Sequence, residues 1–317
     1  MKMPRKQGSN ASKSPLGDVL YNVFTRGAAG VVILIAIGIV FSLAGNSWPA
    51  IEKFGAHFLV DTTWNPVIFE FGALSSIAGT IVSTIIAMII AVPLSVIIAF
   101  FLVELAHPWL SKPIGYAIEL LAAVPSIIYG MWGLFVFAPF MADHIQPALQ
   151  GWFGKLPLFE GPPMGIGMLS AGIILALMIL PFITAVMRDV FRMVPSVVKE
   201  ASFGMGSTTL ETAQNVTVKY GFSGLLGAVF LGLGRAVGET MAVTFVIGNS
   251  HDISASLFAA GNTIASTLAN EFTEAAEPLY MSALIELGLV LFVMTLVIQI
   301  LAQWWIGRTQ KKAGAGL

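Results

Sequence analysis

The chain has 317 residues, of which 56% are hydrophobic and only 10% are charged. Soluble domains carry roughly 25% charged residues, so this chain lacks the polar surface that a soluble enzyme or a nucleic-acid-binding protein needs. Its formal net charge is −1 and it contains no cysteine, which excludes disulfides, cysteine-ligated zinc and thiol nucleophiles. The composition therefore indicates a helical protein that is embedded in a membrane.

Six apolar stretches are long enough to cross a bilayer, because a spanning helix needs about 20 mostly apolar residues. In chain order they cover residues 27–45, 71–103, 113–141, 166–187, 221–248 and 281–306. The second stretch would be about 50 Å long as one helix, which exceeds the hydrocarbon core of a bilayer. We therefore expect a short initial segment near residues 72–78, a spanning helix from about Thr80, and a bend at Pro93.

Basic residues concentrate on one side of these spans, in the two tails and in the loops after the second and fourth spans. On that side lie Lys2, Arg5, Lys6, Lys13, Arg26, Lys112, Arg188, Arg192, Lys199, Lys219, Arg308, Lys311 and Lys312. The opposite side has only Lys53 and Lys155. Because basic loops stay in the cytoplasm, both termini are predicted to be cytoplasmic. A cleaved signal peptide is the alternative for the first span, but the leader over residues 1–26 is long for one.

The spans and loops predict a single membrane domain with short additions at each end. The predicted order is a cytoplasmic tail over 1–26, a first transmembrane helix over 27–45, a periplasmic loop over 46–71, a membrane-spanning domain over 72–306 that contains a cytoplasmic loop over 188–220, and a cytoplasmic tail over 307–317. The first three spans and the last three share no spaced motifs, which disfavours an inverted-repeat transporter.

Four ionisable residues fall within predicted spans: Glu119, Arg235, Glu239 and Glu286. A charge at the bilayer centre costs about 2.5–3.5 kcal/mol, so such residues usually face a cavity or a partner. Arg235 and Glu239 are four residues apart and would share one face of a continuous helix. They predict either a polar constriction that an anion crosses or a structural pair. Glu119 and Glu286 fit a pathway role no better than a role as partners of Arg235 or of another subunit.

The cytoplasmic loop over 188–220 has the pattern of a helix, a turn and a second helix. Pro195 suits the first turn of a helix, and Gly204 and Gly206 would end that helix. The segment from Thr208 to Glu211 fits a capping box that starts another helix. The hairpin is either an amphipathic element on the membrane surface or a docking element for a cytoplasmic motor. The chain has no P-loop and its histidines fall in separate loops, so we expect neither ATP hydrolysis nor a metal site in this chain.

Glu200 and Ala201, followed by Gly206, resemble the EAA…G coupling motif of type I ABC importer permeases, although Ser202 and Lys219 stand where that family has Ala and Pro. Residues 118–135 and 232–245 resemble the third and fifth spans of the PstC-type permeases of phosphate-specific importers, and residues 269–272 fit the last outer loop. The resemblance extends over roughly residues 17–306.

This resemblance implies an all-α type I importer (MetI-like) permease bundle of six transmembrane helices in a bacterial inner membrane. The coupling helices would contact an ATPase through Glu200, Ala201, Gly204 and Gly206. The partners would be a PstA-type sister permease in a heterodimer, a PstB-type ATPase dimer that binds Mg-ATP, and a PstS-type periplasmic phosphate-binding protein. The chain itself would bind phosphate and membrane lipid but no cofactor. The alternatives are a permease for another oxyanion, a proton-coupled secondary anion transporter, and a membrane scaffold or enzyme without transport activity.

Overall fold

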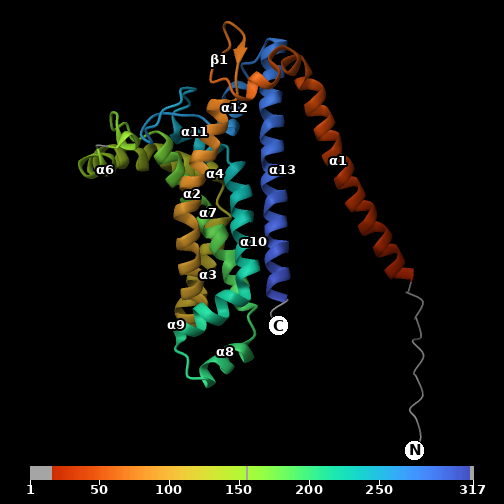
Figure 1. Ribbon diagram of the computed structural model, residues 1–317, viewed down its shortest axis with the longest axis vertical. Helices are drawn as coiled ribbons and strands as arrows, with labels where there is room; N and C mark the ends of the chain where they lie inside the picture. The colour runs from red at the N-terminus through yellow and green to blue at the C-terminus, as the bar shows by residue number, and fades with distance from the viewer. Residues whose placement is uncertain (1–15, 155, 315–317) are drawn as a thin grey trace, which may run out of the picture.

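The computed structural model describes residues 16–154 and 156–314, and the side chains of 17–154 and 156–308, as a bundle of helices elongated along one axis (Figure 1). The α-helices described are α1 (Leu16–Phe54), α2 (Leu74–Phe100), α3 (Pro108–Ala122), α4 (Ser126–Trp132), α5 (Ala138–Phe140), α6 (Gln146–Phe153), α7 (Met168–Arg192), α8 (Ser196–Gly204), α9 (Thr209–Thr212), α10 (Val218–Val237), α11 (Met241–Ile247), α12 (Ile264–Glu271) and α13 (Pro278–Gly314).

Shorter helical segments extend or connect these helices. Two are 3-10 turns, η1 (Gly55–Leu59) and η5 (Pro157–Phe159). Four have π-helical hydrogen bonds, namely η2 (Phe101–Leu105), η3 (Gly133–Phe137), η4 (Met141–Ile145) and η6 (Ala213–Thr217). The two strands, β1 (Trp64–Asn65) and β2 (Glu70–Phe71), form an antiparallel hairpin in which Trp64 lies opposite Phe71.

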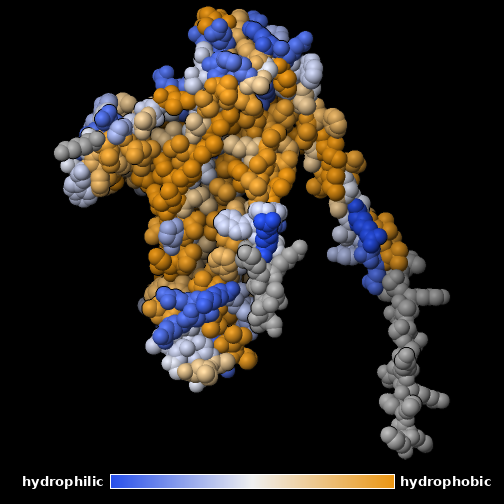
Figure 2. All heavy atoms as spheres, in the orientation of Figure 1, coloured by the Kyte–Doolittle hydropathy of each residue, from blue (hydrophilic) through white to orange (hydrophobic). Residues whose placement is uncertain are grey.

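Six helical segments of the described chain are long and apolar enough to span a membrane, as predicted. They are Gly17–Leu59, Leu74–Leu105, Ser126–Phe153, Met168–Arg192, Thr209–Val237 and Pro278–Arg308. Figure 2 shows apolar residues over the middle of the bundle and hydrophilic residues mainly toward its two ends. The protein is therefore a multi-pass membrane protein. The first described turn of α1 and the last described turn of α13 lie toward the same end of the bundle as α8 and α9 (Figure 1).

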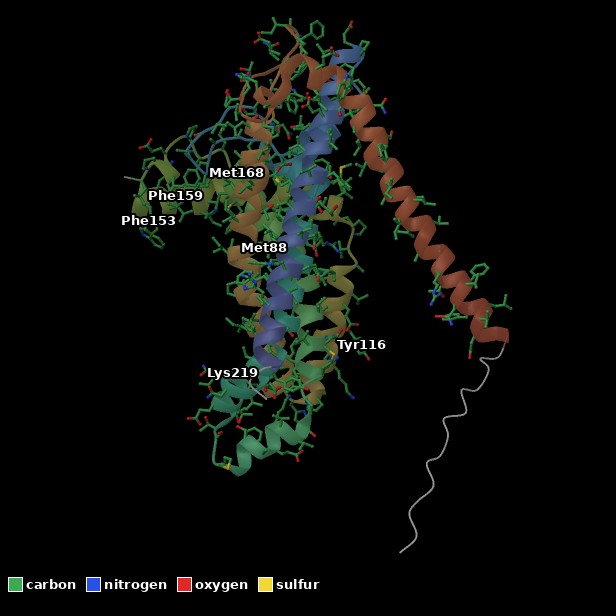
Figure 3. All side chains as sticks on the ribbon, turned by 45° about the vertical axis from the view of Figure 1, so that its right-hand side comes forward. Met88, Tyr116, Phe153, Phe159, Met168 and Lys219 are labelled. Atoms are coloured by element: carbon green, nitrogen blue, oxygen red, sulfur yellow. The ribbon has the colours of Figure 1, made fainter. Side chains whose placement is uncertain are left out.

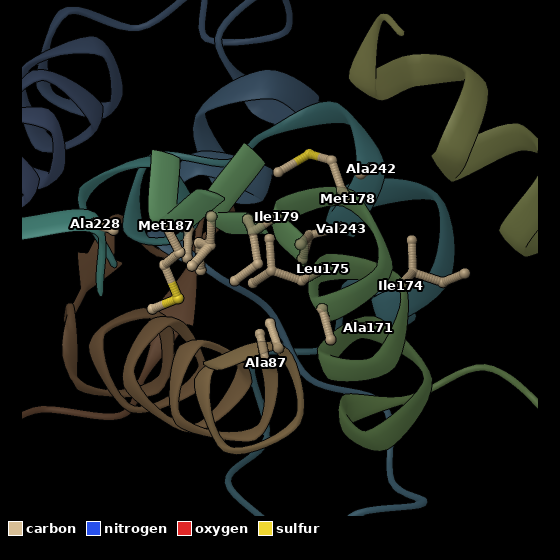
Figure 4. Close-up of a cluster of buried hydrophobic side chains, with 14 of the residues drawn as sticks. Ala87, Ala171, Ile174, Leu175, Met178, Ile179, Met187, Ala228, Ala242 and Val243 are labelled. Carbon is tan, nitrogen blue, oxygen red and sulfur yellow. The ribbon is translucent and has the colours of Figure 1, made fainter. Parts of the chain in front are cut away.

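The core of the bundle forms around α7, whose apolar side chains are buried against α2, α10 and α11. Figure 4 shows Leu175 and Ile179 of α7 facing Ala87 of α2. Small residues allow the close approach of these helices: a Cβ placed at Gly172 would lie 2.5 Å from Cγ2 of Ile86. Burial from all sides gives α7 the role of a central scaffold helix.

A second apolar cluster joins the outer end of α1 to the hairpin, α12 and α13. Its largest buried side chains include Phe58 and Phe71, and the backbone N–H of Ala50 donates to Ser282 Oγ at 3.1 Å. Figures 1 and 3 both show α1 meeting α13 at this end and leaning away from α13 toward the end of the bundle that carries α8. The apolar half of α1 that lies farther from this cluster is consequently exposed in the isolated chain.

The boundaries of several spans differ from the predicted ones. The first helix continues nearly to the hairpin, through part of the segment expected to be a loop. The second starts at Leu74 and continues through Pro93. The third and fifth predicted spans are each interrupted, after Ala122 and after Val237. Pro125 explains the first interruption, because proline lacks an N–H and disfavours helical backbone in the preceding residue. Of the basic residues used for orientation, Lys2, Arg5, Lys6, Lys13 and Lys155 lie outside the described residues.

Candidate functional site

The hairpin formed by α8 and α9, in the segment predicted as the coupling loop, has the local structure that the sequence predicts. Pro195 is the N-cap of α8, which ends at Gly204. Gly206 has a φ of +89°, a backbone conformation that glycine adopts without steric cost. Thr208 and Glu211 form a reciprocal capping box at the start of α9. The tight turn between the two helices therefore depends on Gly206 and on this cap.

The hairpin presents an uncovered apolar surface that also carries the predicted coupling residues. Glu200, Ala201, Gly204 and Gly206 are all exposed. Large exposed apolar side chains accompany them, namely Val197, Phe203, Met205 and Leu210. Met205 alone is 87% exposed. Exposed apolar groups gathered at one tip typically mark a protein interaction site.

Polar contacts tie this hairpin to the membrane-spanning helices. Lys199 Nζ donates to Glu104 at the end of the second span. Ser202 Oγ and Thr212 Oγ1 are 2.9 Å apart and share a hydrogen bond between the two arms of the hairpin. From α9 the chain continues without a break through η6 into α10. A force applied to the hairpin is therefore transmitted directly to two spans.

Arg235 and Glu239 do not share a helix face, which corrects the sequence prediction. Helix α10 ends at Val237 and Arg235 lies in its last turn, where a positive charge is favoured by the helix dipole. Glu239 lies in the break, and its Oε1 accepts the backbone N–H of Ala242 at 3.0 Å. The structure shows no ion pair between these two described residues. Gly238 at the C-cap separates them and redirects the chain.

The guanidinium of Arg235 faces aromatic groups of two other spans. Its Cζ lies 5.2 Å from the centre of the Phe182 ring on α7, a favourable cation–π distance. Its charge also acts on the phenol of Tyr129 on α4. The neighbour of Arg235, Gly234, packs closely against Gln299 of α13: an added Cβ at Gly234 would lie 2.6 Å from Gln299 Nε2. This contact locates Arg235 along α13. Gln299 lies about 10 Å of helix before the end of the last apolar stretch, so Arg235 lies beside the apolar part of that helix.

Two interrupted helices pack against each other next to Arg235. A Cβ at Gly130 of α4 would lie 2.9 Å from the carbonyl oxygen of Met241 at the start of α11. Tyr129 donates its hydroxyl to the Leu121 carbonyl at 3.0 Å, across the break between α3 and α4. Backbone at both breaks is exposed in the isolated chain, at Ala123 and Gly238 among others. Irregular backbone at membrane depth is tolerated only against protein or a water-filled cavity, so we expect this face to be covered by one of the two.

The other two predicted pathway residues lie elsewhere. Glu119 is paired with Arg188 of α7 rather than with Arg235. Glu286 is only 6% exposed, and its Oε2 has no hydrogen-bond partner among the described residues. It lines an apolar groove with residues of α1, α2 and α13. In the sequence, Arg188 is one of the basic residues that indicate orientation, and nothing marks Phe182 or Tyr129, because their contacts depend on packing between spans.

A polar cluster holds the outer loops to the end of the bundle. Glu271 of α12 accepts hydrogen bonds from Trp64 Nε1 and Tyr280 Oη, each at 2.6 Å. Its other oxygen lies 3.0 Å from His251 Nε2. The His251 ring stacks on Trp64, with ring centres 5.4 Å apart, and its Nδ1 accepts from Asn262 Nδ2 at 2.8 Å. The carboxylate of Glu271 thus links the β1–β2 hairpin, the loop before α12 and the start of α13.

The hydrogen bonds at Glu271 determine its ionisation. Burial raises the pKa of Glu271, but hydrogen bonds from His251, Tyr280 and Trp64 together outweigh burial and lower the pKa below the usual value of 4.5. The described residues contain no group of three His, Asp or Glu side chains that could hold a metal ion. The hydrogen bonds that converge on Glu271 make this cluster a structural anchor for the loops that it joins.

Solved structures with the same fold are ABC transporters. A chain of the inward-facing MetNI methionine ABC transporter aligns with a TM-score of 0.55 at 17% identity, over 78% of this chain and 99% of that chain. A chain of a bacterial alginate ABC transporter complex aligns with a TM-score of 0.59 at 13% identity, over 90% of this chain and 94% of that chain. The bundle therefore has the fold of an ABC transporter permease subunit.

Relatives in sequence identify the family. No family model matches the chain. The phosphate transport system permease protein PstC of Mesorhizobium japonicum is 51% identical, over 95% of this chain and 93% of its own length. The protein of that name from Haemophilus influenzae is 50% identical, over 94% of this chain and 95% of its own. A probable phosphate transport system permease protein PstC of Methanocaldococcus jannaschii is 38% identical, over 91% of this chain and 93% of its own length. The chain belongs to the family of the PstC permease proteins.

The outer cluster predicts a loss of stability in acid. Because the pKa of Glu271 is lowered on folding, its stabilisation is present above about pH 4.5 and is lost as the pH falls through the lowered value. We expect the unfolding temperature of the purified protein to fall below pH 4.5, and to fall much less steeply in Glu271→Gln. The exposed outer residue Glu277 supplies the matched control, Glu277→Gln, which should follow the wild type. Equal acid sensitivity of all three proteins would contradict the assignment.

Proposed function

We propose that this chain is the membrane-spanning permease subunit of an ATP-driven importer of inorganic phosphate. The observation that carries the proposal is its identity of about 50% with phosphate transport system permease proteins along nearly the whole chain. The start of α1 and the end of α13 lie on the same side as α8 and α9. Together with the basic loops, this placement supports cytoplasmic termini in an inner membrane. The chain supplies the pathway and holds no nucleotide.

The partner at the cytoplasmic end is a dimeric PstB-type ATPase, which binds Mg-ATP. The exposed apolar tip around Met205, with Glu200 beside it, docks into a groove of that ATPase. Closure of the ATPase on ATP moves the hairpin, and the continuous run from α9 to α10 carries the motion to Arg235. Coupling therefore requires a rigid turn at Gly206.

The second membrane partner is a PstA-type sister permease, which covers the face with the two helix breaks. Phosphate passes between the two permeases along this face. Arg235 supplies a positive charge at membrane depth, and its planar guanidinium suits an oxyanion. Glu239 caps α11 and keeps negative charge close to Arg235 along the chain, which limits how tightly an anion is held.

The outer face receives a PstS-type periplasmic binding protein. Its predicted loops carry many carboxylates and few cations, and the carboxylates are Glu52, Asp61, Glu70, Asp143, Glu160, Asp252, Glu271, Glu274 and Glu277. An electronegative surface repels free phosphate and suits a protein that shields its anion. Delivery by a binding protein follows from this charge pattern.

Substrate selectivity tests the identity of the cargo. The complex reconstituted with its ATPase and phosphate-binding protein should accumulate labelled phosphate only when the binding protein is present. A hundredfold excess of unlabelled phosphate should abolish the signal, whereas the same excess of sulfate should leave it within about twofold. Displacement by sulfate, with none by phosphate, would assign the chain to another oxyanion.

The turn of the coupling hairpin is tested at Gly206. A Cβ there meets no atom within 4 Å, so the cost of Gly206→Val is the strain of positive φ, roughly 1–2 kcal/mol. We expect this variant to assemble but to lose most ATP-driven uptake while ATP hydrolysis continues. Gly206→Asn is the matched variant, because asparagine tolerates positive φ, and it should retain uptake. Normal uptake by the valine variant would remove the hairpin from the coupling mechanism.

The intramembrane cation is tested at Arg235. We expect Arg235→Gln to reduce uptake at least tenfold in a complex shown to be intact by co-purification, because the anion then meets no positive charge at membrane depth. Arg235→Lys should be partly active, since it keeps the charge but loses the planar fork. Near-normal uptake by the glutamine variant, or loss of the complex itself, would leave Arg235 with a structural role only.

A further inference from the structure

A second group of cations lines a cavity at the cytoplasmic end of the bundle, apart from the surroundings of Arg235. The cavity has a volume of about 260 Å³ and lies between α3 and α7; we call it the inner basic cavity. It is lined by Lys112, Gly115, Tyr116, Glu119, Arg188 and Arg192. Figure 3 places Tyr116 toward the end of the bundle that carries α8. Three cations and one carboxylate leave the cavity with an excess of positive charge.

Arg188 is built into this cavity rather than extended into solvent. Its side chain is only 4% exposed, whereas that of its partner Glu119 is 51% exposed. The guanidinium rests against Gly115, where any Cβ would collide with Nη1. Nη2 donates to Glu119, and Nε has no hydrogen-bond partner among the described residues. A buried cation with an unused donor is costly to maintain unless a further acceptor binds.

The pair of Arg188 and Glu119 does not account for the other two cations of the cavity. Arg188 and Glu119 alone would join α7 to α3. Exposed Lys112 and half-exposed Arg192 add like charges to the same cavity, where solvent screens their repulsion only in part. Arg192 has a distant partner in the exposed Asp189, 3.8 Å from its Nη1. An oxyanion in the cavity would offset this repulsion and accept from several donors at once.

The cavity lies on the cytoplasmic side of Arg235 along the same helices. On α7, Arg188 follows Phe182, which contacts Arg235, by about 9 Å of helix toward the cytoplasm. On the other side, Tyr129 of α4 is near Arg235 and Glu119 of α3 contacts Arg188. The interrupted α3–α4 segment therefore passes both cation sites, one deeper in the membrane than the other.

We propose that the inner basic cavity binds a phosphate-type oxyanion as it leaves the pathway for the cytoplasm. The cargo's identity rests on the proposed function. The fork of Arg188 and the ammonium group of Lys112 would contact the anion's oxygens. Glu119 competes with the anion for Arg188, so the anion is released readily. The headgroup of an anionic lipid offers the same chemistry, and the experiment separates the two sources.

Protection of Lys112 from acylation tests the proposal. The full complex is placed in nanodiscs of neutral lipid and treated with an amine-acylating reagent, and modification is followed by mass spectrometry. Millimolar inorganic phosphate should slow acylation of Lys112 at least threefold, and potassium chloride of equal ionic strength should not. Lys219, which is hydrogen-bonded to Asn215 outside the cavity, should react at an unchanged rate. In Arg188→Gln, about tenfold more phosphate should be needed for the same protection.

Controls separate binding from folding and from the proposed function. Arg192 is half exposed, so Arg192→Gln should fold normally yet weaken protection, whereas Arg26→Gln, remote from the cavity, should behave as the wild type. Absence of protection by phosphate in a complex that imports phosphate would overturn this proposal alone. Protection that appears only in nanodiscs of anionic lipid would also overturn it, since the ligand would be lipid. A wild-type complex that imports no phosphate while Lys112 is protected would overturn the proposed function instead.

Discussion

The bilayer requires every backbone polar group to be satisfied within the protein, and two helix breaks determine how this chain meets that requirement. The breaks after Ala122 and Val237 expose backbone at membrane depth. Side chains satisfy part of it, through Tyr129 to the Leu121 carbonyl and Glu239 to the Ala242 N–H. Backbone hydrogen bonds satisfy more of it, such as those from the Ala123 N–H to the Leu120 carbonyl and from the Glu239 N–H to the Ala236 carbonyl, and any group left over needs a second protein or water. This constraint sets the face with the breaks apart from a surface that could face lipid, and Arg235 lies beside the breaks.

The same geometry connects the soluble ends of the protein to that face. The hairpin of α8 and α9 continues into α10, whose opposite end carries Arg235, so a displacement of the hairpin would be felt at Arg235. The ion pair between Lys199 and Glu104 links the hairpin to the second span as well. At the outer end, Glu271 fixes the loops on which a binding protein would rest. Rigid elements with such anchors can move as two-state units.

The sequence predicted the elements that depend on local chemistry. Six apolar stretches gave six spans, and the capping box at Thr208 and the turn glycine Gly206 appeared where expected. The sequence did not predict the helix breaks, because each break is only about three residues long and hardly changes the mean hydropathy of the apolar stretch that contains it. The pairing of Glu119 with Arg188 and the cluster around Glu271 join residues far apart in the chain. Such contacts depend on how the spans pack, which periodicity and composition do not encode.

In the transport cycle that we propose, ATP hydrolysis by a partner is transmitted through the hairpin and drives phosphate past Arg235. It is tested most directly in proteoliposomes that contain the whole complex and its binding protein, with the proton gradient dissipated by an ionophore. We predict that labelled phosphate accumulates when ATP is supplied to the ATPase side and does not accumulate without ATP. Accumulation that follows an imposed proton gradient and is indifferent to ATP would contradict the claim and identify a secondary transporter.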